Sequence, residues 1–291
     1  MKTTLIILNY NDGERTKGLL LQAAGYDVIN DIVVVDNAST DDSYELLKAE
    51  EGEHIHVIRR NTNGGYAKGN NEGALYALKK LKPDIIFIAN PDVSFTEPVA
   101  KAMAEALMDN DRYAAVAPFV RQGYNVWDLP GFTGILRSLF LFSFTAEKIL
   151  VKKAVERTGE DLVPVGVIEG SFFAVSAEKF REVSGFDERT FLYGEEIMLA
   201  RRFRRKGYRE AVLPKIRYDH LHSASIKKIY RSSKAAAFYH FRDSFRIYNK
   251  YYLKTGPLED RIFDLCWQLG LLERKVFDIM TPAFRTGMTK H

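Results

Sequence analysis

Polar side chains follow four apolar segments of the sequence, each at the point where the segment ends. The groups are Asn9-Tyr10-Asn11, Asp36-Asn37-Ala38-Ser39, Asn61-Thr62-Asn63-Gly64-Gly65 and Asn90-Pro91-Asp92. In doubly wound sheets, ligands bind beyond the carboxyl ends of the strands. Each group taken alone is typical of an ordinary turn. Four in equivalent places predict a polar rim that can hold a base, a ribose and a diphosphate.

Phosphate groups bound at this rim would need a positive partner, because the sequence has neither a P-loop nor the dinucleotide-binding fingerprint. The run from Gly64 to Gly69 has the wrong glycine spacing for that fingerprint. A divalent metal held by oxygen ligands is the natural substitute, with Asp92 projecting beyond the apolar run at 85–89. The structural alternative for Asn90-Pro91-Asp92 is a capped turn that leads into a helix over 97–107.

Two adjacent acids, Glu195 and Glu196, open a further predicted helix. Carboxylates at a helix N-terminus interact favourably with the helix dipole, which is a purely structural explanation. They also follow the aromatic segment from Phe191 to Tyr193, and partial burial there would raise the pKa of a carboxyl group toward working pH. A carboxylate of this kind can act as the general base for a hydroxyl nucleophile.

A pair of histidines is the last group that could carry chemistry. In His220-Leu221-His222, alternation places both imidazoles on one face of an extended segment. Histidine is a common ligand for borderline metals. The alternative for this pair is an ordinary core or surface position.

The elements that must position these residues alternate along the first half of the chain. Apolar runs predict strands over 3–8, 32–35, 55–58 and 85–89, and helices are expected over 14–24, 43–51, 70–81 and 97–107. Strands that are apolar on both sides and separated by helices favour a mainly parallel sheet covered on both faces. The fold class is therefore α/β.

The second half of the chain does not continue this regular alternation of strands and helices. After a loop-like stretch at 123–134, we expect one helix over 135–155, a strand over 165–175 and a turn-rich connection over 180–191. Further helices are predicted over 195–206, 234–252 and 259–280.

Composition narrows the class of protein. The chain has 291 residues, of which 46% are hydrophobic and 27% charged, with a net charge of +4. This excludes a disulfide-stapled miniprotein and a disordered chain. Cys266 is the one cysteine, which fits a reducing compartment. We find neither a signal peptide nor a bilayer-spanning segment, since the best candidate at 135–144 is short and contains Arg137. A cytoplasmic protein is expected.

Charge is distributed unevenly. Residues 201–256 contain sixteen Lys and Arg and three acids, which gives this region a net charge of +13. The rest of the chain therefore has a net charge of −9. Seven aromatic residues fall within 238–252. Basic and aromatic side chains together favour an anionic membrane surface or a lipid-linked partner. The alternatives are a solvated helical face and a homodimer formed by the aromatic helices. No nucleic-acid module is recognisable, so no nucleic-acid partner is expected.

Taken in order, six sequence blocks resemble family 2 glycosyltransferases of the GT-A fold, particularly the rhamnosyltransferase-like branch. The resemblance covers about residues 3–225, continuing to His220 and Ser225. Its blocks are Ile6 to Asn11, Val34 to Asp41, Asn63 to Asn71, Asn90 to Val93, Gly185 to Glu188 and Tyr193 to Glu196.

The resemblance implies a nucleotide-diphosphate-sugar donor, a divalent metal (Mn²⁺ or Mg²⁺) and transfer with inversion. It places Asp92 as a metal ligand, His220 as a second metal or diphosphate contact, and Glu196 as the general base, with Glu195 as the alternative base. The donor-binding residues that it implies are Asn9, Asn11, Asp36, Asn63, Gly65, Lys68, Asn70 and Asn90.

The resemblance also implies the acceptor and the organisation of the chain. Related enzymes build bacterial surface polysaccharides, so we expect a saccharide or polyprenyl-linked acceptor and a cytoplasmic protein peripheral to the membrane, with Lys227, Lys228 and Arg231 near the site. Residues 1–225 are expected to form the GT-A domain and 226–291 a basic, aromatic helical extension. Rhamnose is the favoured sugar, and other hexoses stay open.

Two departures from the family pattern keep other functions open. Glu196 stands where relatives usually carry Asp, and Met198 replaces a third acid. The acid motif is therefore altered, and a non-catalytic nucleotide- or glycan-binding module is one alternative. A sugar nucleotidyltransferase is the other, although the usual glycine-rich, basic signature does not follow the first strand. We expect the side chain of His222 either to add a contact in the site or simply to fill space there.

Overall fold

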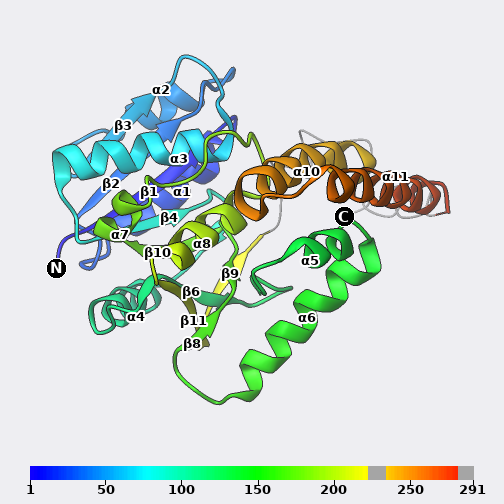
Figure 1. The fold of residues 1–291 in the computed structure, drawn as a ribbon. Helices are drawn as coiled ribbons and strands as arrows, with labels where there is room; N and C mark the ends of the chain where they lie inside the picture. Colours follow the sequence, from blue (N-terminus) through cyan, green and yellow to red (C-terminus); the bar gives the residue numbers. More distant parts are fainter. Residues whose placement is uncertain (222–233, 281–291) are drawn as a thin grey trace.

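A nine-stranded sheet forms the centre of the molecule in the computed structural model, which describes residues 1–221 and 234–280 (Figure 1). The strand order is β3-β2-β1-β4-β10-β6-β11-β5, with β8 paired to β11. The strands are β1 (Thr3–Asn9), β2 (Asp31–Asp36), β3 (Ile55–Arg59), β4 (Ile85–Ala89), β5 (Val93–Ser94), β6 (Tyr113–Val120), β8 (Val163–Val165), β10 (Phe172–Ser176) and β11 (Arg209–His220). A separate two-stranded sheet pairs β7 (Val126–Trp127) with β9 (Val167–Ile168).

Strands β3, β2, β1 and β4 are parallel neighbours, as the alternating sequence pattern predicts. Asn9 at the end of β1 pairs in register with Asp36 at the end of β2, and Asp36 pairs with Arg59 at the end of β3. The four polar groups of the sequence therefore lie along one edge of the sheet. Because β10 runs antiparallel to β4 and β6, the sheet is mixed beyond this point.

Helices cover both faces of the sheet. One face packs against α1 (Gly13–Ala24), α2 (Ser43–Lys48) and α4 (Glu97–Met108), and the other against α3 (Gly65–Tyr76), α7 (Ala177–Glu182) and α8 (Glu195–Arg205). A π-helical turn, η1 (Ala77–Leu81), continues α3. Burying apolar side chains on both sides of a parallel sheet is the arrangement expected of continuous apolar strands.

A third core joins the helices of the second half. It packs α5 (Phe132–Ser138), α10 (Lys234–Tyr248), η2 (Asn249–Leu253) and α11 (Pro257–Met280) beside α8, while α6 (Leu141–Arg157) packs Val151 and Val155 against the second face of the sheet. Phe238, Phe245, Tyr248 and Tyr252 are buried in it. Most of the aromatic side chains of 238–252 therefore pack inside the protein, and Tyr239 and Tyr251 are the exposed ones.

Several expected elements differ from those observed. Residues 135–155 form two helices instead of one, and 165–175 form parts of β8, β9 and β10 instead of one strand. The helix expected from residue 70 begins at Gly65, and the turn-rich connection over 180–191 includes the end of α7. Strand β6 was not foreseen. The boundary expected at 225/226, together with His222, Ser225, Lys227, Lys228 and Arg231, lies outside the described residues.

Within 1–221 and 234–280, no helix has the length and apolar character needed to cross a bilayer.

A candidate active site at the carboxyl ends of the strands

A cavity of about 440 Å³ opens at the edge where β1, β2 and β4 end. Its wall combines the strand ends with the start of α8 and with parts of α5, α6 and α10. This volume lies within the range of small-molecule sites. The sequence-predicted site residues that line it are Asn63, Gly65, Asn90, Asp92, Glu195, Glu196 and His220.

Asn9 and Asp36 lie behind this wall and do not line it. Both are fully buried, and Nδ2 of Asn9 donates hydrogen bonds to Oδ1 of Asp36 at 2.9 Å and to Oγ of Ser39 at 3.0 Å. The backbone N–H of Asn11 also donates to Oγ of Ser39, at 3.0 Å. The cluster therefore fixes the loops after β1 and β2 from within.

Asn11, Lys68 and Asn70 also lie outside the cavity wall. The side chain of Asn11 bonds to Thr40 across the two loops, at 3.2 Å. Asn70 is buried in α3, where its Nδ2 donates to the backbone oxygen of Tyr66 at 3.1 Å. Donor binding by these three residues therefore stays a prediction.

Asp92 and His220 meet at the rim of the cavity. Strand β5 pairs antiparallel with the end of β11, and this brings Nε2 of His220 to 3.4 Å from Oδ1 of Asp92. Glu169 stands on the other side of the imidazole, 4.0 Å from Nδ1. Burial of His220 opposes its charged form, but the hydrogen bond and charge of Asp92 and the charge of Glu169 outweigh burial, so its pKa is raised.

The donor set of Asp92 and His220 is suited to a divalent cation, since carboxylate oxygen suits Mn²⁺ and Mg²⁺ and imidazole suits borderline metals. Over 1–221 and 234–280, no group of three or more His, Cys, Asp or Glu side chains is arranged to hold an ion. Two side chains could thus begin a coordination sphere, and a bound substrate would have to supply further oxygens.

Glu195 and Glu196 enter the cavity from the N-terminus of α8. Gly194 precedes them with a φ of +82°, a left-handed conformation that glycine adopts without strain. Burial raises the pKa of both carboxyl groups, and the charge of Glu196 adds to the effect at Glu195. Backbone N–H groups moderate the pKa of Glu196, among them that of Gly170, which lies 3.5 Å from its Oε1.

Sequence reasoning missed four charged residues that line the cavity, Asp128, Glu147, Lys148 and Glu169, of which Lys148 and Glu169 interact with the predicted site residues. Lys148 projects from α6 over aromatic rings, with Nζ 3.6 Å from the ring centroid of Trp127 and 4.2 Å from that of Phe144. Burial lowers the pKa of Lys148 to about 8, against the opposing charges of Glu169 and Glu196. Glu169 could have been identified from the sequence, because it is an acidic residue within an apolar run, and the same feature had identified Asp92.

Close backbone contacts fix the loop that precedes Glu195. The backbone N–H of Tyr66 donates to the oxygen of Phe191 at 3.1 Å, and Gly65 beside it has a φ of +83°. A Cβ on Gly65 would stand 2.0 Å from the oxygen of Phe191. Glycine is therefore required here for the start of α3 to reach this loop.

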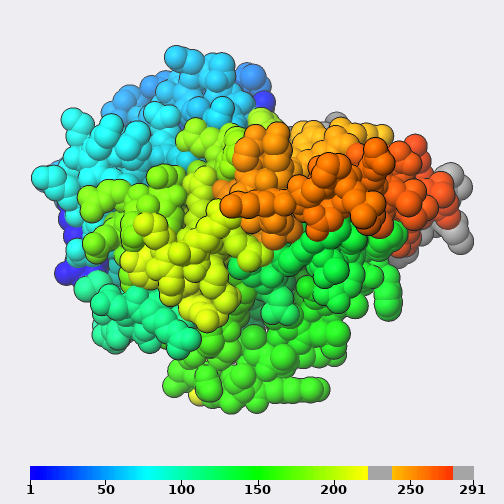
Figure 2. All heavy atoms as spheres, in the orientation of Figure 1, coloured from blue at the N-terminus to red at the C-terminus, as the bar shows by residue number. Residues whose placement is uncertain are grey.

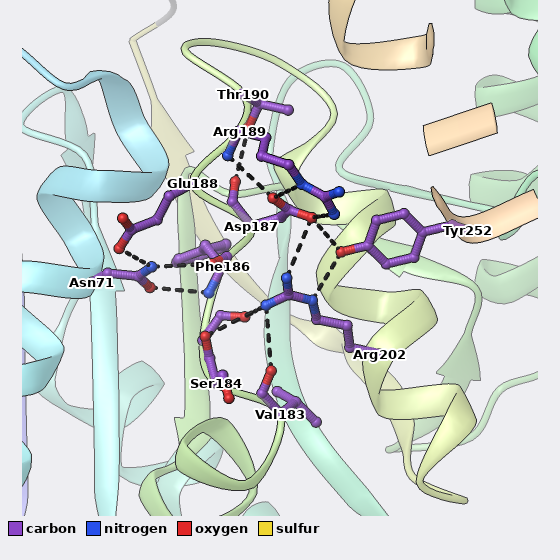
Figure 3. Close-up of polar contacts among 11 residues, drawn as sticks. Asn71, Val183, Ser184, Phe186, Asp187, Glu188, Arg189, Thr190, Arg202 and Tyr252 are labelled. Carbon is purple, nitrogen blue, oxygen red and sulfur yellow. Dashed lines mark hydrogen bonds and ion pairs between the residues drawn. The ribbon is translucent and has the colours of Figure 1, made fainter. Parts of the chain in front are cut away.

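An ionic cluster around Asp187 supports the start of the same loop (Figure 3). Its carboxylate accepts hydrogen bonds from Arg189 and from Tyr252 of η2, the latter at 2.6 Å, and Arg202 of α8 lies 3.3 Å away. Nearby, Asn71 of α3 bonds to Phe186, accepting from its N–H at 2.9 Å. The loop is thereby tied to α3, α8 and the C-terminal helices.

Comparison with known proteins assigns the chain to a family. A model of the family described as glycosyl transferase family 2 matches residues 4–183. The chain is 27% identical over 255 residues to the low-salt glycan biosynthesis hexosyltransferase Agl10 of Haloferax volcanii, covering 87% of this chain and 77% of that protein. It is 24% identical over 196 residues to the N-acetylglucosaminyl-diphospho-decaprenol L-rhamnosyltransferase of Mycobacterium tuberculosis. This match covers 63% of this chain and 64% of that protein.

A solved structure gives a matching result for the fold. The mannosyltransferase PcManGT from Pyrobaculum calidifontis, in complex with GDP-Man and Mn²⁺, superposes with a TM-score of 0.63 at 15% identity. The match covers 97% of this chain and 75% of that one. The shared architecture is the GT-A fold expected from the sequence.

Proposed function

This chain belongs to glycosyl transferase family 2, and on that premise we propose that it transfers a hexose, with rhamnose favoured, from a nucleotide-diphosphate sugar to an acceptor hydroxyl with inversion. The observation that carries the proposal is that two pairs of ionisable side chains line the same cavity. Buried Glu195 and Glu196 enter it at the start of α8, and the Asp92–His220 pair stands at its rim.

Glu196 is the proposed general base, and Glu195 is the alternative. A base must be ionised before it accepts the acceptor proton, and a raised pKa strengthens its basicity near neutral pH. Backbone N–H groups and Lys148 stabilise the ionised form of Glu196. Burial and the charge of Glu196 raise the pKa of Glu195 well above its ordinary value, which disfavours the ionised form of Glu195. This difference favours Glu196.

The Asp92–His220 pair is proposed to hold a divalent cation together with the donor diphosphate. When bound, the cation supplies positive charge that stabilises the leaving nucleoside diphosphate. Lys148 adds a second positive charge in the same cavity. Asn63, Gly65 and Asn90 line the portion of the wall where the nucleoside would bind, while Asn9 and Asp36 keep that portion in shape.

The acceptor is proposed to be a saccharide or a polyprenyl-linked saccharide used in surface polysaccharide synthesis. The mycobacterial relative, by its name, acts on a decaprenol-linked sugar. The excess of Lys and Arg in the sequence of 201–256 suits the diphosphate of such an acceptor and peripheral contact with an anionic membrane. In this proposal residues 1–225 form the catalytic domain and 226–291 the extension.

A donor panel tests the proposal. The protein would be mixed with Mn²⁺ and, in turn, dTDP-rhamnose, UDP-glucose, UDP-galactose, UDP-N-acetylhexosamines and GDP-mannose. A fitting donor should raise the thermal midpoint, because binding stabilises only the folded state, and Asp92→Asn should abolish that shift. Binding without donor hydrolysis or transfer would indicate a non-catalytic module. Release of pyrophosphate from a nucleoside triphosphate and a sugar phosphate would indicate a nucleotidyltransferase.

A further inference from the structure

Helix α11 has two apolar faces, and among residues 1–221 and 234–280 one of them packs against other elements. Phe263, Trp267 and Leu271 are at most 9% exposed and join the third core. A second row of apolar side chains, between 38% and 70% exposed, runs along the helix. Its members are Leu258, Ile262, Leu265, Leu269, Leu272 and Val276.

The spacing of this second row is that of a coiled coil. Its members follow one another at alternating intervals of four and three residues, a period of 3.5 that keeps one seam facing a partner helix. At roughly 100° per residue, the row lies on the side of α11 opposite Phe263 and Trp267. In Figure 2 the orange-to-red residues of α11 lie at the surface of the molecule. Within the part of the chain that the structure describes, this row is exposed and has the spacing of a coiled-coil seam.

The residue types within the seam specify a partner. Assigning Ile262, Leu269 and Val276 to heptad positions a places Leu258, Leu265 and Leu272 at positions d. Two of the three a residues, Ile262 and Val276, are β-branched, and β-branched residues at a combined with leucine at d favour two parallel strands. A parallel pair puts identical positions opposite each other, which is the self-complementary arrangement of a two-fold dimer.

The flanking charges agree with parallel pairing. The g positions carry Arg261 and Lys275, and the e positions carry Glu259 and Glu273. In a parallel pair each g residue faces the e residue five positions further along the partner, so Arg261 meets Cys266, Gln268 meets Glu273, and no like charges are opposed. An antiparallel pair with the same core would place Glu259 opposite Glu273 and Arg261 opposite Lys275, so like charges would meet.

The same charges argue against an anionic membrane as the occupant of the seam. Between residues 258 and 276 the helix carries four acids and three bases, whereas helices that bind anionic bilayers are rich in Lys and Arg. We propose that the chain is a homodimer held by a parallel coiled coil of α11. The six-member seam would extend for about 27 Å at 1.5 Å per residue.

Phe142 extends this surface beyond the seam. It is 83% exposed at the start of α6, next to Leu141, whose N–H donates to Oε2 of Glu273 at 2.9 Å. Glu273 is an e-position residue, so Phe142 stands at the edge of the proposed interface. Its exposure is explained if the partner helix covers it.

Sedimentation velocity at micromolar concentrations tests the dimer. The parent chain should sediment as a dimer and Leu265→Asp as a monomer, because the substitution places a charge in the centre of the seam. Leu75→Asp is the matched control, since Leu75 is 49% exposed on α3, away from α11, and should remain dimeric. Circular dichroism establishes that each variant is folded. A monomeric parent, or a Leu265→Asp dimer, would overturn the proposal.

A disulfide tests the orientation. Leu272→Cys in a Cys266→Ser background places the chain's one thiol at a d position. In a parallel dimer the two residues face each other and should cross-link fully under mild oxidation. In the antiparallel register they would lie about 15 Å apart and stay reduced. A dimer that does not cross-link would contradict parallel pairing, and a monomeric parent that floats with neutral vesicles would identify the seam as a lipid-binding face.

Discussion

The phenol of Tyr252 donates a hydrogen bond of 2.6 Å to Oδ2 of Asp187 and so joins the C-terminal helices to the loop that leads into Glu195 (Figure 3). Burial opposes ionisation of Asp187. Hydrogen bonds from Arg189 and Tyr252 and the charge of Arg202 overcome this, and they hold the pKa of Asp187 well below its usual range. The loop is thus anchored by an ionised carboxylate.

Tyr252→Phe should destabilise the protein while leaving the fold intact. The variant loses two hydrogen bonds to charged groups, one to Asp187 and one from Nε of Arg202 at 2.8 Å, and such bonds contribute about 1.5–3 kcal/mol each. Urea unfolding monitored by fluorescence measures the change in the free energy of unfolding. Tyr251→Phe, on the exposed neighbour, is the control and should match the parent. Equal stability of Tyr252→Phe and the parent would show that the anchor contributes nothing.

Gly65→Ala should damage both stability and donor binding. The added Cβ would meet the backbone oxygen of Phe191 at 2.0 Å, and the φ of +83° disfavours any side chain. The loop over the cavity must move to admit it, so we expect a lower thermal midpoint and a raised KM for the donor. Gly52→Ala is the control, because a Cβ at Gly52 has no neighbour within 4 Å. Similar KM values for the two variants would contradict this role of Gly65.

Donor affinity should weaken as the pH rises through about 8, the pKa of Lys148. Below that value the ammonium is charged and attracts the diphosphate, and above it the attraction is lost. The Kd of the donor, measured by calorimetry between pH 6.5 and 9.5, should show this break in the parent. In Lys148→Arg, which keeps its charge throughout, the break should disappear. A break that persists in Lys148→Arg would assign it to another group.

Glu210→Gln should stabilise the protein at alkaline pH. Burial raises the pKa of Glu210 to about 8, against the hydrogen bond from the N–H of Ile168. The folded state therefore binds a proton that the unfolded state has released between the ordinary value of 4.5 and about 8, so stability falls as pH rises across this window. The glutamine keeps an acceptor for Ile168 without the charge. Thermal midpoints should decline with pH less in the variant, and parallel declines would refute the assignment.

The strands up to β4 could be predicted closely from the sequence because local apolar runs define them. The break between α5 and α6 could not. There the oxygen of Leu139 accepts from Arg274 and the N–H of Leu141 donates to Glu273, both residues of α11. No local pattern encodes contacts between segments so far apart.

The candidate site, too, could be predicted from the sequence only in part. Asp92 was identified as an acid at a segment end and His220 as one of a histidine pair, and their separate positions in the sequence gave no indication of the 3.4 Å contact. Glu169 was missed because 165–175 was interpreted as one strand. The strand is interrupted at Gly170, where the hydroxyl of Tyr66 bonds to the backbone oxygen and leaves no room for a Cβ. That interruption aims Glu169 at the cavity.

The turnover of Glu196→Gln at saturating donor tests the central claim most directly, that a buried carboxylate of α8 deprotonates the acceptor beside the bound donor. We predict that kcat falls by about 10²–10⁴-fold, that the donor-induced rise in thermal midpoint is unchanged, and that Glu195→Gln keeps most of the activity. Parental kcat in both glutamine variants would contradict the account.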